Sequence, residues 1–412
     1  MKQRYDSYKP SGIDWIGDIP SHWNMSSVGK HYQVILGKML CPKPLDATYT
    51  LEEYYCAGDV HFDGVNGGTL KQMWFSPEEK EKYLVHKSDL LIVEGGAGAG
   101  GCAVVHNKTD KNIYIQNSIL IARHSQNSTV FLKYLIETLV KAGYIDRECN
   151  EATFSHFTKE KVCNVPFPVI PIPEQLAIAT WLEEKCGEID AAIAKVDREL
   201  ELIDELKQSE ISRVVTRGLN LDVSLRPSGI DWIGDVPEHW IIAPFKRSLR
   251  INNGCDYKHI VSEEGYPVIG SGGQFAFASD YLYDGEVLLL GRKGTIDRPM
   301  YFIGKFWTVD TMFYAVPNDN VCCKYMYYQA LGFPYDYYST ATALPSMAAS
   351  DLANNPIIVP PLFEQQAIAD HIDKKCAEID GLKAKLVKKR ETLKELRQAI
   401  ISEVVTGKRK VI

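Results

Sequence analysis

Two long stretches of the chain place apolar residues at helical spacing. Residues 174–216 and 363–406 contain no proline and are rich in Ala, Leu, Glu and Lys, which favour helix. Their apolar residues recur at steps of three, four or seven, which is typical of a heptad repeat. The set is Leu182, Ile189, Ile193, Val196, Leu200 and Ile203 in the first stretch, and Ile372, Ile379, Leu382, Leu386, Leu393, Leu396 and Ile400 in the second. The pattern predicts two paired helices, although each helix could also pack on its neighbouring domain alone.

The charges of the two stretches favour pairing with each other. Residues 165–219 carry 6 Lys/Arg and 11 Asp/Glu, a net of −5, whereas residues 355–412 carry 12 and 8, a net of +4. Opposite charge makes the helices natural partners. Related helices pair most readily through a two-fold axis, so we expect an antiparallel coiled coil of about 40 residues, roughly 60 Å long at ~1.5 Å per residue.

Between these stretches the apolar residues form shorter runs broken by glycine and polar turns. The segments "DLLIVEGG" (89–96), "NIYIQNSILIA" (112–122), "EVLLLGRKG" (286–294) and "KFWTVDTMFYAV" (305–316) are typical of strands. The segments "STVFLKYLIETLV" (128–140) and "CCKYMYYQALG" (322–332) are typical of short helices. Residues 24–164 and 241–354 are therefore predicted to be mixed α/β domains of ordinary size.

The chain repeats itself. "PSGIDWIGDIPSHW" (10–23) and "PSGIDWIGDVPEHW" (227–240) match at 12 of 14 positions, and the two long stretches align without a gap at an offset of 190. We call each 14-residue segment a leader. A tandem duplication explains both repeats. It predicts an α/β (α+β) protein with four segments: domain one with its leader (1–164), helix one (165–219), domain two with its leader (220–354) and helix two (355–412).

Composition sets the broad class. A chain of 412 residues with 45% hydrophobic and 24% charged residues is typical of a soluble globular protein of two or more domains. There is no run of eighteen apolar residues, and "MKQRYDSYKP" lacks the apolar core of a signal peptide, so we expect a cytoplasmic protein without membrane contact. The 10 cysteines form no C-x-x-C pair, so reduced thiols are expected, with no metal site.

Motifs for catalysis are absent from the sequence. "GGAGAGG" (95–101) formally matches G-x-G-x-x-G, but "CAVVHNK" after it indicates another strand, whereas a dinucleotide or S-adenosylmethionine site needs a helix there. A glycine turn that allows close backbone approach is the preferred interpretation. No P-loop, zinc-protease or nucleophile-elbow motif occurs either. We therefore expect a non-enzyme that binds no cofactor itself, with a stand-alone enzyme that uses the glycine loop as the alternative.

Recognition of nucleic acid is the remaining chemistry. Glycine turns in the second domain carry Ser, Gln, Arg, Lys and Thr side chains, which suit contacts to phosphates and to the edges of guanine and adenine. "TLKQMWF" (69–75) and the arginine after a strand offer similar groups in the first domain. Ordinary solvated turns would have the same composition. The candidate DNA-binding residues are Lys71, Gln72, Arg123, Ser271, Gln274, Arg292, Lys293, Thr295 and Arg298.

These features together resemble one family, the specificity subunits of Type I restriction-modification systems, over essentially the whole chain. The resemblance is carried by the two leaders, by "SDLLIVEGG" (88–96), and by "IPIPEQLAIATWL" (170–182) and "VPPLFEQQAIADHI" (359–372), where proline and Glu-Gln precede a long helix. Ser88 stands where the family pattern has glycine before Asp89, a minor departure.

The resemblance implies two target-recognition domains, each reading half of a split site in double-stranded DNA. It implies that the helices set the gap and dock methyltransferase subunits, two being expected, which bring S-adenosylmethionine; a restriction/translocase subunit is a further partner of such complexes. The spacer and docking residues would include Glu174, Gln175, Ile189, Ile193, Glu364, Gln365, Ile379 and Leu386. Each leader would anchor its domain beside the helix ends through buried tryptophans. The rival interpretation is a coiled-coil adaptor with two α/β modules, which would bind no DNA with or without a partner.

Overall fold

The computed structural model describes residues 3–66, 68–106, 111–124, 126–148, 150–151, 154–338 and 345–411. Contacts divide the chain into two compact units, Met1–Val196 with Lys389–Ile412, and Asp197–Lys388. Each unit therefore contains one leader, one α/β domain and portions of both long helices. The four predicted segments describe the order of modules along the chain and stay a prediction. Within the described part of the chain, no helix combines the length and apolar character needed to cross a membrane.

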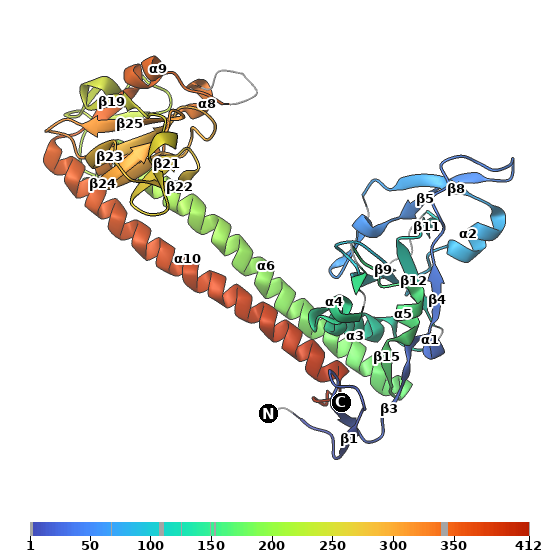
Figure 1. The fold of residues 1–412 in the computed structure, drawn as a ribbon. Helices are drawn as coiled ribbons and strands as arrows, with labels where there is room; N and C mark the ends of the chain where they lie inside the picture. Colours follow the sequence, from blue (N-terminus) through green and yellow to red (C-terminus); the bar gives the residue numbers. More distant parts are fainter. Residues whose placement is uncertain are drawn as a thin grey trace. The chain divides into compact units, whose positions relative to one another are not determined.

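The two long helices are α6 (Ile172–Arg217) and α10 (Leu362–Val405) (Figure 1). In the second unit Lys207 pairs with Asp380 at 2.7 Å and Asp204 pairs with Lys383 at 2.6 Å, so a step forward along α6 is a step backward along α10. In the first unit Asp190 of α6 pairs with Arg397 of α10 at 2.9 Å. The predicted antiparallel pairing is thus present in each unit, and most of the pairs join an acidic residue of α6 to a basic residue of α10.

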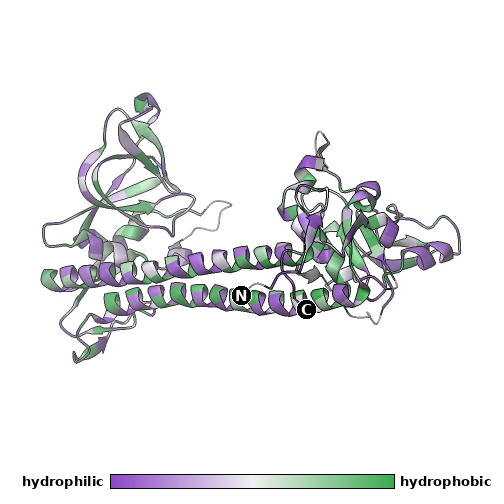
Figure 2. Ribbon diagram, turned by 90° about the horizontal axis from the view of Figure 1, so that it is seen from below, coloured by the Kyte–Doolittle hydropathy of each residue, from purple (hydrophilic) through white to green (hydrophobic). Residues whose placement is uncertain are grey.

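The predicted apolar seam is wrong at two positions of α10. Leu382 is 52% exposed and Leu396 is 47% exposed, whereas Ile379 is buried. At 100° per residue these two leucines point roughly 60° and 100° away from Ile379. A straight helix drifts relative to a strict 3.5-residue pattern, so some apolar residues that fit a heptad in the sequence leave the contact face. Figure 2 shows hydrophilic and hydrophobic residues alternating along both helices.

The first domain contains two small sheets covered by helices. A four-stranded sheet has the order β10-β9-β12-β4, and a three-stranded sheet has the order β11-β5-β8. Its strands and helices, with the leader hairpin, are β1 (Tyr8–Pro10), β2 (Asp18–Pro20), β3 (Asn24–Ser27), α1 (Val28–His31), β4 (Gln33–Leu36), β5 (Thr50–Tyr55), η1 (Ala57–Asp59), β6 (Val60–His61), β7 (Gly64–Val65), β8 (Lys71–Phe75), α2 (Pro77–Tyr83), β9 (Leu90–Val93), β10 (Cys102–Val104), β11 (Ile113–Ile115), β12 (Ile119–Arg123), α3 (Thr129–Lys141), α4 (Tyr144–Glu148), β13 (Asn150–Glu151), β14 (Phe154–Ser155), α5 (Lys159–Asn164) and β15 (Pro166–Val169).

The second domain contains one larger sheet with the order β19-β25-β23-β24-β21-β22-β20. Its elements are β16 (Leu225–Pro227), β17 (Asp235–Pro237), β18 (Ile241–Pro244), η2 (Phe245–Arg247), β19 (Leu249–Asn253), η3 (Lys258–Ile260), β20 (Val261–Ser262), β21 (Tyr266–Gly270), β22 (Gly273–Ala278), β23 (Tyr283–Gly291), β24 (Met300–Thr308), β25 (Met312–Pro317), α7 (Cys323–Ala330), α8 (Tyr335–Tyr338), α9 (Ala349–Asn354) and β26 (Pro356–Val359). The strands and short helices predicted from the apolar runs are present in both domains.

The two domains share a frame that their sequences do not reveal. The strand after each leader pairs antiparallel with the strand before each long helix, as β3 with β15 and β18 with β26. The registers coincide: Ser27 faces Pro166, and Pro244 faces Pro356, positions related by the two repeat offsets. The duplication therefore extends into the variable domains, which keep the same entry and exit.

A continuous core joins the modules of each unit. In the first unit Ile16, Ile19 and Trp23 of the leader belong to one buried cluster with Leu182 of α6 and Val404 of α10. In the second unit the leader residues Ile233, Val236 and Trp240 cluster in the same way with both helices and with α7. The domains are thus fixed to the helices by apolar burial, as expected for the leaders.

Candidate nucleic-acid interface

Arg292 lies in the turn that follows β23, an inner strand of the sheet of the second domain. Its backbone N–H donates to the carbonyl of Thr311 at 2.8 Å, which fixes the turn against the start of β25. Its guanidinium donates to the carbonyl of Asp310 at 3.3 Å and lies 5.8 Å from the centre of the Phe313 ring. These contacts use only part of the guanidinium fork, which has five N–H donors. The side chain is oriented by the protein and retains donors for a ligand.

A cavity of about 300 Å³ opens beside this turn. Arg292 and Lys293 line it together with Asn253 and Ser346, and Phe313 forms an apolar wall. Lys293 is exposed and forms an isolated β-bridge with Ser346. Ser271 adjoins the same turn, because a Cβ placed on Gly294 would lie 3.3 Å from its Oγ. The structure thus brings Arg292 and Lys293 together at one cavity and places Ser271 beside the same turn.

The other predicted residues of this domain lie on neighbouring turns. Gln274 is exposed on β22, next to Gly273, which pairs with Gly270 at the turn between β21 and β22. Thr295 is half-buried and its carbonyl approaches Gly291, while Arg298 is exposed on the segment before β24. Asn253 and Ser346 were not predicted, because both are distant from Arg292 in sequence and only the fold brings them to the cavity. No local signal in the sequence could have identified them.

In the first domain the predicted residues have different surroundings. Lys71 and Gln72 are exposed on β8, an outer strand of the three-stranded sheet, and stay candidates for contact with DNA. Arg123 donates to both carboxylate oxygens of Asp89 at 2.6 Å and to the carbonyl of Leu84 at 2.9 Å. Asp89 is only 1% exposed, so Arg123 neutralises a buried charge. We therefore correct the prediction for Arg123, whose role in this structure is internal.

The glycine-rich loop of this domain leads into a strand. Residues 95–101 follow β9, and β10 begins at Cys102, so the element that follows this loop is a strand and not a helix. This arrangement does not fit the phosphate-binding turn of a dinucleotide fold, which requires that helix. Among the described residues no group of three His, Cys, Asp or Glu side chains could hold a metal ion.

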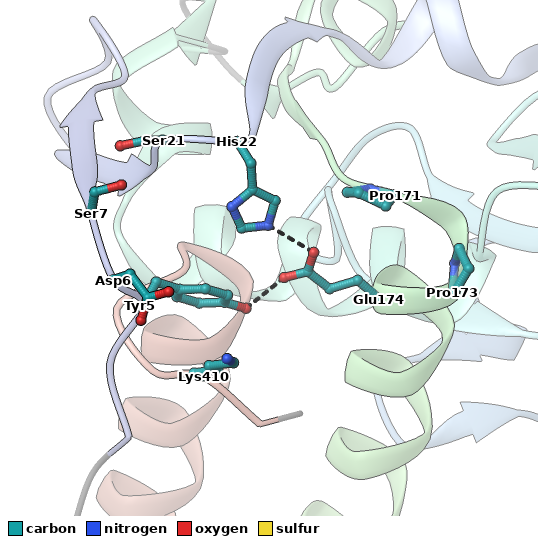
Figure 3. A pocket seen from close by; sticks show the side chains of 9 residues that line it. All are labelled: Tyr5, Asp6, Ser7, Ser21, His22, Pro171, Pro173, Glu174 and Lys410. Atoms are coloured by element: carbon teal, nitrogen blue, oxygen red, sulfur yellow. Dashed lines mark hydrogen bonds and ion pairs between the residues drawn. The ribbon is translucent and has the colours of Figure 1, made fainter.

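Each leader is tied to the first turn of a long helix by one glutamate. In the first unit Glu174 accepts a hydrogen bond from Tyr5 Oη at 2.8 Å and pairs with His22 Nε2 at 2.9 Å (Figure 3). It also accepts a hydrogen bond from Trp23 Nε1 at 3.2 Å. An open cleft of about 810 Å³ lies beside these groups, with Lys410 on its wall. Burial and the hydrogen bond to Glu174 raise the pKa of Tyr5 above its usual value, so the phenol remains a donor.

The second unit repeats this arrangement. Glu364 accepts from Trp240 Nε1 at 2.9 Å and pairs with His239 Nε2 at 2.8 Å. The tryptophan ring also covers the glycine that ends the other helix. Gly218 and Gly407 have φ of +76° and +74°, and a Cβ on either would lie within 3.0 Å of the Trp240 or Trp23 ring. Glycine is therefore required there both for the left-handed helix end and for the contact. One His-Trp pair thus joins the start of one helix to the end of the other in each unit.

The glutamine beside each glutamate holds the domain. Gln175 accepts from the backbone N–H of Ser128 at 2.5 Å, and Gln365 accepts from that of Cys322 at 3.0 Å. Ser128 and Cys322 are the N-cap residues of α3 and α7. Both glutamines are essentially buried, at 0% and 1% exposure, so a partner subunit cannot dock on them. The predicted docking role of Gln175 and Gln365 is therefore wrong, and their role is to join each domain to its helix.

The other predicted docking residues are largely covered as well. Ile379 is buried, and Ile189, Ile193 and Leu386 are half-buried. Glu174 and Glu364 are engaged by the leaders as described. On the described part of the helices of the second unit, the large apolar side chains that remain most exposed are Phe363 at 70%, Leu206 at 56%, Leu382 at 52% and Leu202 at 46%. Phe363 lies in the first turn of α10, whereas the three leucines lie farther along the two helices. These exposed side chains are a better match to a docking surface than the residues predicted from the sequence.

Comparisons with known proteins agree with this architecture. Residues 244–388 match the family model described as the Type I restriction modification DNA specificity domain. No curated protein sequence matches the chain. The chain is similar in structure to one from a study of complex assembly and conformational transition of the type I R-M system, with a TM-score of 0.76 and 15% identity over 94% of this chain and 98% of that one. It is also similar to the HsdS subunit from Thermoanaerobacter tengcongensis, with a TM-score of 0.56, 15% identity and the same coverage.

Proposed function

We propose that the chain is a member of the Type I restriction-modification DNA specificity family, whose model matches residues 244–388, and that each of its two α/β domains reads one half of a split DNA site. The observation that carries the proposal is the cavity lined by Arg292 and Lys293, with Ser271 beside its turn, which lies inside the family domain. An oriented guanidinium with donors to spare suits the O6 and N7 acceptors of guanine in the major groove. Lysine, serine and backbone N–H groups suit phosphates.

We further propose that the split site is asymmetric, with an unread gap set by the helices. The two domains share a frame but present different side chains, which favours two different half-sites. α6 and α10 are unbroken over 46 and 44 residues, and each enters its first turn through the same Pro-x-x-Glu-Gln junction. Rigid helices between two readers are suited to fix the distance between the bases that are read.

Catalysis belongs to partner subunits in this proposal. Methyltransferase subunits, two per chain, dock on the paired helices and bring S-adenosylmethionine, and a restriction/translocase subunit joins some assemblies. The exposed leucines Leu202, Leu206 and Leu382 are the favoured contacts on the helices, because covering them removes apolar surface from water. The partners also supply positive surface for DNA, which this chain, with a formal net charge of −7, lacks.

The test is the substitution Arg292→Ala in cells that carry the chain with its methyltransferase. Single-molecule sequencing of methylated DNA should show one relaxed position in one half-site, with about 5- to 150-fold less discrimination, the range of a bidentate base contact. The other half-site should stay unchanged. Arg247→Ala is the matched control, since Arg247 is an exposed arginine of the same domain outside the cavity.

Three other outcomes have distinct meanings. Uniform weakening at all sequences would assign Arg292 to the phosphate backbone. An unchanged motif would show that this turn does not read DNA. Methylation that never depends on the wild-type chain would contradict the proposed function itself and favour the coiled-coil adaptor.

A further inference from the structure

The turn that carries Arg292 has a counterpart in the first domain, held by the same backbone hydrogen bonds. In both domains the residue after an inner strand (β9 or β23) donates its N–H to the residue just before the adjacent strand (β12 or β25). Its carbonyl accepts from the segment before a short helix (α5 or α9). The bonds are Glu94 N to Ser118 O (2.9 Å) and Phe157 N to Glu94 O (2.6 Å), matched by Arg292 N to Thr311 O (2.8 Å) and Met347 N to Arg292 O (3.0 Å). Glu94 is therefore the structural equivalent of Arg292.

The next residue of each turn confirms the match. Gly95 forms an isolated antiparallel bridge with His156, and Lys293 forms one with Ser346. His156 and Ser346 are related by the offset of 190 that also relates the two long helices. Isolated bridges outside the named strands would not be expected at related positions of the two domains unless the domains share this part of the fold. The two turns and the two facing segments are thus the same part of the fold.

A third segment completes the correspondence. Gly37 and Gly254, which are 217 residues apart like the leaders, donate N–H to Ile119 at 3.0 Å and to Met312 at 3.1 Å. A Cβ on Gly37 would lie 2.4 Å from the carbonyl oxygen of Gln116, and one on Gly254 would lie 2.0 Å from that of Val309. Only glycine allows such a close approach of two backbones. In both domains the loop after β4 or β19 therefore packs against the segment that leads into β12 or β25.

We infer that the first domain reads its half-site through Glu94, Asn117 and His156, a surface that occupies the place of Arg292, Asp310 and Ser346. The inference rests on the proposed function, since it transfers the reading position from the domain that matches the family to the one that does not. This surface takes the place of Arg123 among the candidate readers of this domain, beside Lys71 and Gln72. Glu94 and Asn117 are half-buried and His156 is exposed, so all three residues keep surface that a ligand can contact.

The exchanged side chains change the chemistry that each surface recognises. Arg292 and Lys293 offer only donors and select acceptors such as guanine O6 and N7. At the equivalent positions Glu94 offers acceptors, and Gly95 has no side chain. A carboxylate at a base edge accepts from an exocyclic amino group, and cytosine N4 is its usual partner in the major groove. The first half-site is therefore expected to contain a cytosine contact where the second half-site has a guanine contact.

The experiment uses the chain assembled with its methyltransferase and compares methylated motifs across genomic DNA. Glu94→Gln keeps the shape and one acceptor but removes the charge, and should relax one position of the first half-site by about 5- to 150-fold. The second half-site and the gap should not change. Glu81→Gln is the matched control, because Glu81 is an exposed glutamate of the same domain on α2. His156→Ala should alter the first half-site as well.

The outcomes separate the two levels of the proposal. An unchanged first half-site in both Glu94→Gln and His156→Ala, with a relaxed second half-site in Arg292→Ala, overturns the inference and leaves the proposed function standing. A change in the second half-site caused by Glu94→Gln also overturns it. If Glu94→Gln abolishes all methylation, the result with His156→Ala decides, since that exposed side chain is not part of the core.

Discussion

At the scale of residues, the two leaders repeat in sequence because each makes the same contact with the ends of the long helices. The repeated Trp at the end of each leader donates to the glutamate in the first turn of a long helix and covers the glycine at the end of the other helix. A carboxylate in the first turn also faces the positive end of the helix dipole. Because Trp23 and Trp240 are 0% and 2% exposed, their indole N–H groups depend on these glutamates for a partner.

We predict that Glu364→Ala destabilises the protein by about 1–3 kcal/mol, because it leaves a buried indole donor unsatisfied. Glu364→Gln should cost less, since its carbonyl oxygen can still accept from Trp240. Urea unfolding followed by tryptophan fluorescence measures both variants, with Glu263→Ala, at an exposed position of the same unit, as the control. Equal stability of Glu364→Ala and the wild-type chain would contradict the proposed role of Glu364 in joining the leader to α10.

The limits of sequence reasoning are clear at this scale. Arg292 and Lys293 were identifiable because a short basic glycine turn contains its own signal. Arg123 looked equivalent, yet it pairs with Asp89, a partner 34 residues away that only the fold supplies. Gln175 looked like a docking residue because it is repeated, but repetition marks any contact that both units need. Glu94 gave no signal at all, because its meaning depends on the equivalent position in another domain.

At the scale of elements, the charge asymmetry of the long helices was a better guide than their apolar pattern. It predicted that the two helices pair with each other, and Asp204–Lys383 and Asp190–Arg397 each join an acidic residue of α6 to a basic residue of α10. The antiparallel direction was predicted from the duplication instead, and Asp190–Arg397 and Lys207–Asp380 lie at positions related by the repeat offset of 190. The heptad pattern placed Leu382 and Leu396 in the seam, where they are not. The net charge of a helix does not depend on small rotations about its axis. The set of residues at the contact face between two helices does change when a helix rotates by a few tens of degrees.

We expect paired insertions in the helices to widen the unread gap of the DNA site. Four residues added after Val196 and four after Lys388 leave both compact units intact and add one turn, about 6 Å, to each helix. At ~3.4 Å per base pair the gap should grow by roughly one to two base pairs, with both half-sites unchanged. Sequencing of methylated DNA reads the gap directly.

The control for this experiment is an insertion near Lys207 in α6 alone. It shifts Asp204 and Lys207 relative to Lys383 and Asp380, so the pairing in the second unit is lost and activity should fall. Retained activity with an unchanged gap in the doubly inserted chain would refute the role of the helices as a spacer.

At the scale of the whole molecule, the sequence predicted the duplicated architecture because its flanks repeat with few changes. It could not predict that the two variable domains share a backbone frame, since those middles have diverged in side chains while keeping hydrogen bonds that any residue can make. Gly37 and Gly254 are the exception, where the close approach itself demands a residue type. The same divergence is what a protein with two different half-sites needs.

The last prediction concerns binding by the chain alone. Residues 24–164 carry 15 Lys/Arg and 16 Asp/Glu, and residues 241–354 carry 9 and 11, so neither domain has the basic excess that attracts DNA phosphates. We expect the isolated chain to bind random and target duplexes alike, with dissociation constants of about 10⁻⁴ to 10⁻⁶ M at physiological salt. Adding the methyltransferase should tighten binding to the target duplex selectively and steepen its dependence on salt, because the partner contributes most of the phosphate contacts. Gel shifts at two salt concentrations, with and without the partner, measure this. Tight and sequence-specific binding by the lone chain would show that its two reading surfaces suffice, and that the partner contributes only catalysis.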